Sequence, residues 1–137
     1  MSPFPLTPGF ALAVGIALLV SFVAQPFLLK VSASTCGEKS PSWFTAFFAL
    51  ISASLASVLT GLVYGLTVGM LLGSVSTWLS GLGSAVLSFV VTSVIYSAFL
   101  RISVARGAAV AVVHWLISLL WWGGLALILK TLAALMA

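Results

Sequence analysis

The chain has 137 residues, of which 63% are hydrophobic and only 4% are charged. Globular domains carry about 25% charged residues, so this composition excludes a soluble domain and indicates a single membrane domain over residues 1–137. The net charge of +4 comes from cations spread along the chain, which do not form the clustered basic face that nucleic-acid binding requires.

Apolar runs long enough to cross a bilayer recur along the chain. A crossing helix needs about 20 apolar residues, whereas a barrel strand would show about ten residues of alternating polarity, which these unbroken runs lack. The sequence therefore predicts an all-α integral membrane bundle of four transmembrane helices. Their predicted bounds are about 10–29, 43–72, 76–100 and 108–130.

The second and third predicted helices come from one stretch, 40–100, that has no charged side chain. As a single helix this stretch would be nearly three times as long as the hydrocarbon core, which is about 30 Å thick, so it must fold back. Gly73 can end a helix in the left-handed conformation, and Ser74 or Ser76 can cap the next one. We therefore predict a turn at 73–76.

Four crossings place the loops 30–42 and 101–107 on the same side of the membrane. These loops contain four of the five cations. Because loops rich in Lys and Arg face the cytoplasm, we expect both loops to be cytoplasmic and both termini to lie on the opposite side. Lys130 is then a minor exception near the outer end of the fourth helix.

Small residues recur at every fourth position along the second predicted helix. Helices in lipid associate through close van der Waals contact, which glycine permits. The repeat forms a glycine zipper that can pack within this chain's own bundle or against another copy or another subunit. A four-residue step turns a helix by 400°, so the stripe drifts by about 40° per step. The predicted packing or partner face consists of Ser57, Gly61, Gly65, Gly69 and Gly73.

Hydroxyl side chains recur with the same spacing along the third predicted helix. The series consists of Ser76, Ser80, Ser84, Ser88, Thr92 and Tyr96. Such hydroxyls can bond to carbonyls of their own helix or reach a neighbouring helix. The alternative interpretation is that they line a narrow polar path for a solute.

His114 is the only histidine and lies about two turns inside the fourth predicted helix. Ionisable groups within the membrane are rare and suggest a function by default. A neutral imidazole could bind a haem iron or a chlorophyll magnesium, flanked by Trp115, Trp121 and Trp122. The sequence offers no second ligand of comparable quality, so we expect no cofactor. A hydrogen bond from His114 to a neighbouring helix, for example to a serine, is the simpler interpretation.

Catalytic chemistry has little support in the sequence. Glu38 is the only acidic residue and lies in a loop, so the chain has no carboxylate pair for acid–base catalysis and no membrane carboxylate for ion coupling. No Cys/His cluster has the spacing of a metal site. The leading hypothesis is a non-catalytic accessory or assembly subunit that docks on other membrane proteins or on copies of itself. The alternatives are a small channel or uncoupled carrier for a neutral solute, lined by the hydroxyl series, and a haem- or chlorophyll-binding subunit.

Overall fold

The computed structural model describes residues 7–72 and 77–136, and these residues form four helices. The helices are α1 (Pro8–Thr35), α2 (Trp43–Leu72), α3 (Thr77–Leu100) and α4 (Val104–Met136). Each is long and apolar enough to cross a membrane. The predicted fold class, an all-α chain of four membrane-spanning helices, is therefore confirmed. The predicted turn at 73–76 lies outside the described residues.

The starts of the helices are set by capping side chains. Thr7 accepts a hydrogen bond from the backbone N–H of Phe10 at 3.3 Å, which caps α1. Ser42 accepts one from the N–H of Thr45 at 3.1 Å, so α2 begins at the predicted residue. Such a bond satisfies an N–H group that has no carbonyl partner within the helix.

α4 begins four residues earlier than predicted, because Ser103 caps it. The Ser103 hydroxyl accepts from the N–H of Arg106 at 3.4 Å, and its carbonyl accepts from the N–H of Gly107 at 2.9 Å. The polar segment 101–107 therefore contains only a three-residue connection, and Arg106 already lies in the first turn of α4. A charged residue marks where a helix leaves the hydrocarbon, but it does not end the helix.

α1 and α3 end with the same local structure. A residue just past each helix has a positive φ. It is Gly37 in α1, which follows the C-cap residue Cys36 and has a φ of 74°, and Arg101 directly after α3, with a φ of 55°. In each case the next N–H donates back into the helix, to the carbonyl of Ala33 at 2.9 Å in α1 and of Ser97 at 3.0 Å in α3. This is the Schellman pattern of helix termination. It explains why α1 continues past Lys30, where the sequence prediction ended it, to Thr35.

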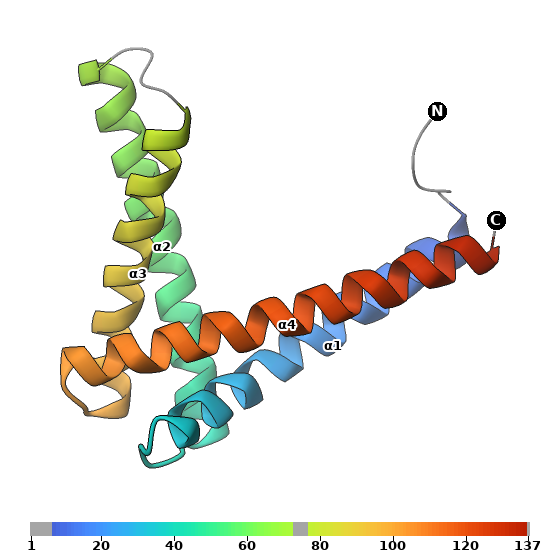
Figure 1. The fold of residues 1–137 in the computed structure, drawn as a ribbon, viewed down its shortest axis with the longest axis horizontal. Coiled ribbons are helices and arrows are strands. Elements are labelled where there is room, and N and C mark those ends of the chain that lie inside the picture. Colours follow the sequence, from blue (N-terminus) through green and yellow to red (C-terminus); the bar gives the residue numbers. More distant parts are fainter. Residues whose placement is uncertain (1–6, 73–76, 137) are drawn as a thin grey trace.

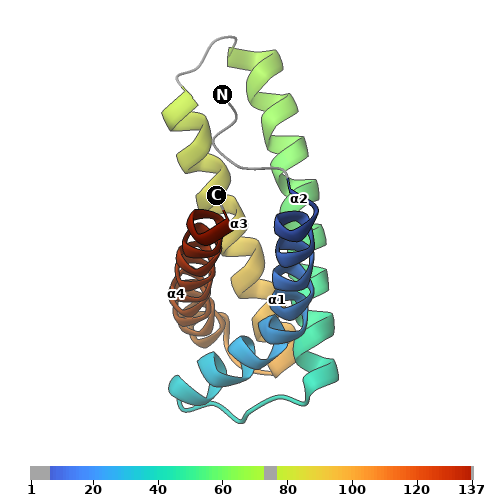
Figure 2. The ribbon, with the colours of Figure 1, turned by 90° about the vertical axis from the view of Figure 1, so that its right-hand side faces the viewer.

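The helices are arranged as two antiparallel pairs, α2 with α3 and α1 with α4 (Figure 1). The pairs meet at one corner, where α1 and α3 end and α2 and α4 begin, and they diverge from it (Figures 1 and 2). In the described residues each helix packs against its chain neighbours, and α1 also packs against α4. Within the described residues the backbones of the diagonal pairs, α1 with α3 and α2 with α4, do not come close to one another. The four packed helix pairs therefore form a closed ring, α1–α2–α3–α4–α1. The α2–α3 pair and the α1–α4 pair move apart with distance from the corner (Figures 1 and 2).

The buried core lies at this corner. Its members come from all four helices and are mostly small: Leu29, Ala33, Ala46, Ala49, Ala53, Tyr96, Val110 and Ala111. Alanine lets helix backbones approach closely, which is the main source of helix association in lipid. The small residues at the start of α2 therefore pack within this chain.

An ion pair closes the same corner on the outside. The Arg106 guanidinium lies 3.1 Å from the Glu38 carboxylate, and it joins the α1–α2 connection to the first turn of α4. The two polar segments that were predicted to share one side of the membrane therefore lie together at one end of the molecule.

Candidate functional site

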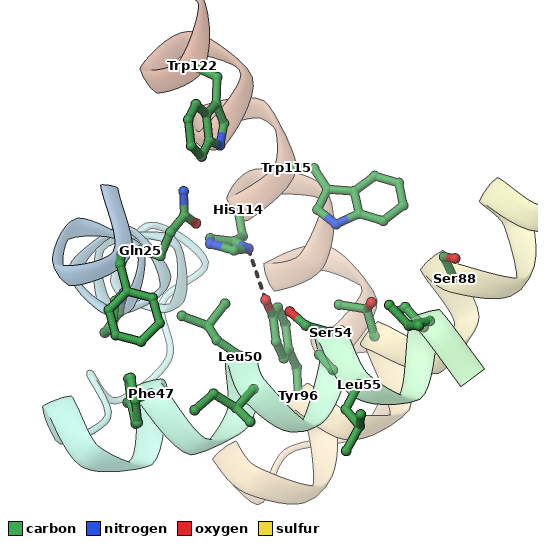
Figure 3. A pocket seen from close by; sticks show the side chains of 17 residues that line it. Gln25, Phe47, Leu50, Ser54, Leu55, Ser88, Tyr96, His114, Trp115 and Trp122 are labelled. Atoms are coloured by element: carbon green, nitrogen blue, oxygen red, sulfur yellow. Dashed lines mark hydrogen bonds between the residues drawn. The ribbon is translucent and has the colours of Figure 1, made fainter. Parts of the chain in front are cut away.

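A cavity of about 750 Å³ lies between the helix pairs, next to the buried corner. All four helices contribute to its wall (Figure 3). The residues from α1 and α2 are Phe22, Gln25, Pro26, Phe47, Leu50, Ile51, Ala53, Ser54, Leu55, Ser57 and Val58. Those from α3 and α4 are Ser88, Thr92, Tyr96, His114, Trp115 and Trp122. The cavity exists because the diagonal helix pairs are held apart.

His114 is the polar centre of this wall, and its side chain is hydrogen-bonded at both ring nitrogens. Nδ1 lies 2.9 Å from the hydroxyl of Tyr96 on α3, and Nε2 lies 3.4 Å from the hydroxyl of Ser118, one turn further along α4. The Ser118 hydroxyl donates to the Oε1 atom of Gln25 on α1, at 3.3 Å. The sequence-based expectation that His114 bonds to a neighbouring helix is met, with a tyrosine as the partner there.

The donor direction of the Ser118–Gln25 bond fixes the order of the whole chain of bonds. Because Ser118 gives its only proton to Gln25, it must accept from Nε2–H of His114. Nδ1 then carries the lone pair and accepts from Tyr96 O–H. We call Tyr96, His114, Ser118 and Gln25 the polar chain. It links α3, α4 and α1 through neutral groups alone.

A second bond between α1 and α4 lies close by in the sequence. The indole N–H of Trp121 donates to the hydroxyl of the buried Ser21 at 3.0 Å. Trp121 thus acts in helix packing, whereas its neighbours Trp115 and Trp122 line the cavity. The three tryptophans that were grouped around His114 in the sequence therefore have two different roles.

The polar wall also contains side chains that have no partner inside the described part of the chain. Ser54, Ser88 and Thr92 line the cavity and make no side-chain hydrogen bond there. Other helical hydroxyls, such as those of Ser32 and Ser93, bond to carbonyls of their own helix at 2.7 Å. The Gln25 amide likewise uses its oxygen, and its N–H groups make no bond among the described residues. Donors are thus available at the cavity surface.

The structure divides the predicted hydroxyl series. Ser88, Thr92 and Tyr96 lie in the cavity wall with His114. Ser84 lies instead at the α2–α3 contact, where its Oγ is 3.8 Å from the Cβ position of Gly61. Ser80 is further towards the start of α3 and is not part of the cavity. Ser76 lies outside the described residues. The continuous polar path for a solute stays a prediction.

The glycine stripe is also divided. Ser57 lines the cavity and Gly61 faces α3, but Gly65 and Gly69 have nothing within 4 Å of the Cβ position. The drift of about 40° per step explains this change. Over two steps the stripe positions rotate around α2, away from the side of the helix that packs against α3. Gly73 lies outside the described residues.

Among the described glycines, Gly83 and Gly107 leave no room for a Cβ atom next to a neighbouring helix. A Cβ atom on Gly83 would overlap the ring of Tyr64, which crosses from α2. On Gly107 it would lie 2.5 Å from the carbonyl oxygen of Ser93, so the start of α4 rests directly on the α3 backbone. Neither glycine lies in the predicted stripe, and single glycines of this kind give no periodic signal in a sequence.

Sequence reasoning missed Gln25, Ser118 and Ser21 as site residues. Gln25 did carry a signal, because it is the only glutamine of the chain and lies within an apolar run. An uncharged amide in the membrane needs a partner just as an ionisable group does. Ser118 follows His114 by four residues, which places both on one helix face.

Both ring nitrogens of His114, the atoms that would bind the metal of a haem or chlorophyll, already make hydrogen bonds. A metal at Nε2 would have to displace the Ser118 hydroxyl, and the other nitrogen is held by Tyr96. In residues 7–72 and 77–136, no group of three His, Cys, Asp or Glu side chains comes together to hold a metal ion. The features that the described residues build at this site are the polar chain and the cavity.

No family model matches the chain, and comparisons with curated proteins and with solved structures find no match.

Proposed function

We propose that this chain is a non-catalytic subunit of a larger membrane assembly, and that it docks through the face of α2 that carries Gly65 and Gly69. The observation behind the proposal is that both glycines lie exposed on α2 with nothing within 4 Å of the Cβ position. Within the described part of the chain, helix packing therefore makes no use of them.

Energetics favour a partner at this face. Glycine inside a helix costs about 0.5–1 kcal/mol relative to alanine. In lipid that cost is offset when another helix approaches the exposed backbone, since association there depends on close contact. Leu62 and Leu66 lie exposed next to the glycines and would supply the surrounding contact area. The partner is another membrane subunit or a second copy of this chain.

The test is purification in mild detergent followed by native mass measurement. We expect the wild-type protein to co-purify with a partner chain or to be purified as an oligomer. Gly65→Leu with Gly69→Leu should release it as a single chain, because two leucines keep the backbones apart.

Gly123→Leu with Gly124→Leu is the matched control, since both positions are exposed on α4 with nothing within 4 Å of their Cβ positions. This variant should keep the assembly. A wild-type protein that is purified as a single chain would contradict the proposal. Loss of the assembly in the Gly123→Leu, Gly124→Leu variant alone would show that the docking face lies on α4 instead.

A further inference from the structure

We infer that the cavity between the helix pairs binds a neutral lipid-soluble molecule of the quinone class. Its carbonyl-bearing ring would lie against the polar chain, and its hydrocarbon tail would extend from the cavity into the lipid along α2. The inference goes beyond the proposed docking role and rests on a different set of residues.

The ring oxygens of such a molecule match the unused donors of the cavity wall. Ser54, Ser88 and the N–H groups of Gln25 have no partner within the described residues. In hydrocarbon a donor without a partner costs several kcal/mol, so an occupant that accepts hydrogen bonds is favoured over an acyl chain. Gln25 and Ser88 lie at opposite sides of the cavity, with His114 and Ser54 between them (Figure 3). Donors at two sides suit a ring that carries acceptors at two opposite positions.

The wall also selects a neutral head group. None of the residues that line the cavity is charged, and all members of the polar chain are uncharged hydrogen-bonding groups. A phosphate or carboxylate here would be buried without a counter-charge, which is far more costly than burying a carbonyl. The head groups of phospholipids are therefore disfavoured.

Aromatic side chains from all four helices suit a flat ring. Phe22 on α1 and Phe47 on α2 meet edge to face, with ring centroids 5.6 Å apart. On the other wall Trp115 meets Phe89 edge to face at 5.5 Å. Trp115 and Trp122 lie on the same helix as His114, α4 (Figure 3). Offset or edge-to-face contact with such rings stabilises an aromatic or quinoid head.

An apolar stripe on α2 gives the tail a route to the lipid. Ile51, Leu55 and Val58 line the cavity and are at the same time 43%, 60% and 61% exposed. Their spacing of four and three residues places them on one helix face. The cavity volume of about 750 Å³ lies within the range of about 300–1,000 Å³ that is usual for ligand sites. Head and tail thus each have a matching surface.

Binding can be measured by tryptophan fluorescence, with the full chain in lipid nanodiscs and decylubiquinone as the probe. A quinone quenches a nearby indole, so we expect saturable quenching in wild type, reduced in amplitude by Trp115→Phe with Trp122→Phe. Gln25→Leu and Ser88→Leu should each weaken binding about ten-fold or more, which corresponds to a loss of about 1.4 kcal/mol.

Thr67→Leu serves as the control, because Thr67 is exposed on α2 outside the cavity and bonds only to the Val63 carbonyl of its own helix. It should leave the dissociation constant unchanged. If a leucine variant fails to fold, Ser88→Ala and Ser54→Ala test the same donors. These substitutions remove the hydroxyl groups without adding bulk to the cavity wall.

Four outcomes would overturn the inference. Quenching that rises linearly without saturation would show partition into lipid alone. Equal dissociation constants for wild type, Gln25→Leu and Ser88→Leu would show that the polar wall does not recognise the ring. Equal binding of decylbenzene, which has the tail but no carbonyls, would show that only the apolar stripe is used. A haem or chlorophyll absorption band in the purified protein that disappears in His114→Phe would assign the site to a pigment.

Discussion

A methyl group on Gly107 would lie 2.5 Å from the carbonyl oxygen of Ser93 and 3.0 Å from the backbone nitrogen of Ser97. Backbone atoms of α3 cannot rotate away as a side chain can. Gly107→Ala should therefore separate α4 from α3 and destabilise the fold by about 1–3 kcal/mol, the usual cost of overpacking. Loss of helical circular dichroism during titration with a denaturing detergent measures this change.

Gly65→Ala is the control for Gly107→Ala, because the space around the Gly65 Cβ position is open. Alanine is the better helix former, so this variant should be neutral or slightly more stable. Equal stability losses in both variants would contradict the close contact of α4 with α3.

Removal of the Tyr96 hydroxyl should weaken the polar chain at its first bond. Hydrogen bonds between membrane helices contribute roughly 0.6 kcal/mol on average and at most about 1.7 kcal/mol. Tyr96→Phe should lose an amount in this range, because the bond to His114 Nδ1 at 2.9 Å is buried. A double-mutant cycle with His114→Phe isolates the pair.

Tyr64→Phe provides the comparison, since Tyr64 is the only other tyrosine of the sequence. Its hydroxyl lies against Gly83 and makes no hydrogen bond among the described residues. We expect no loss of stability there. If Tyr96→Phe and Tyr64→Phe behave alike, the Tyr96–His114 bond contributes nothing measurable.

The two left-handed helix ends should differ in their sensitivity to substitution. Gly37→Ala places a Cβ atom at a φ of 74° and should cost about 1 kcal/mol. Arg101→Gly relieves the same strain at a φ of 55° but gives the unfolded chain more freedom, so it should change stability by only a few tenths of a kcal/mol. Equal losses in thermal unfolding would argue against a left-handed conformation at Gly37.

The orientation in the membrane can be tested with Cys36, the single cysteine of the chain. If the α1–α2 connection is cytoplasmic, a maleimide that cannot cross the membrane should label Cys36 only after the cells are permeabilised. Cys36→Ser with Leu135→Cys moves the thiol to the exposed end of α4 and should be labelled in intact cells. The reverse pattern would place the polar loops outside and contradict the positive-inside assignment.

Helix number and the bounds of α2 could be predicted because both depend on local chemistry. Apolar length sets how many helices cross the membrane, and Ser42 at the start of α2 is a capping residue. The bounds of α1 and α4 were predicted less accurately, since Lys30 and the polar segment 101–107 were treated as helix boundaries. The actual boundaries at Gly37 and Ser103 depend on backbone conformation and capping bonds.

The arrangement of the helices could not be read from the sequence. A soluble helix shows which face is buried through its polar side, but lipid favours apolar residues on every face. The pairing of α1 with α4, and therefore the contact of Gln25 with Ser118, leaves no periodic pattern. The same applies to Gly107, whose role depends on where Ser93 lies after folding.

α1 pairs with α4, which follows it in the sequence only after α2 and α3, and this has a consequence for biosynthesis. The Trp121–Ser21 and Ser118–Gln25 bonds connect residues 100 and 93 positions apart. The α2–α3 hairpin can assemble as soon as both helices leave the ribosome. α1 can pair with α4 only after α4 has been synthesised, and synthesis proceeds at about 5–20 residues per second. During that delay Ser21 and Gln25 face lipid without their partners. The nascent chain is therefore most open to membrane chaperones and proteases after α3 has been inserted and before α4 arrives.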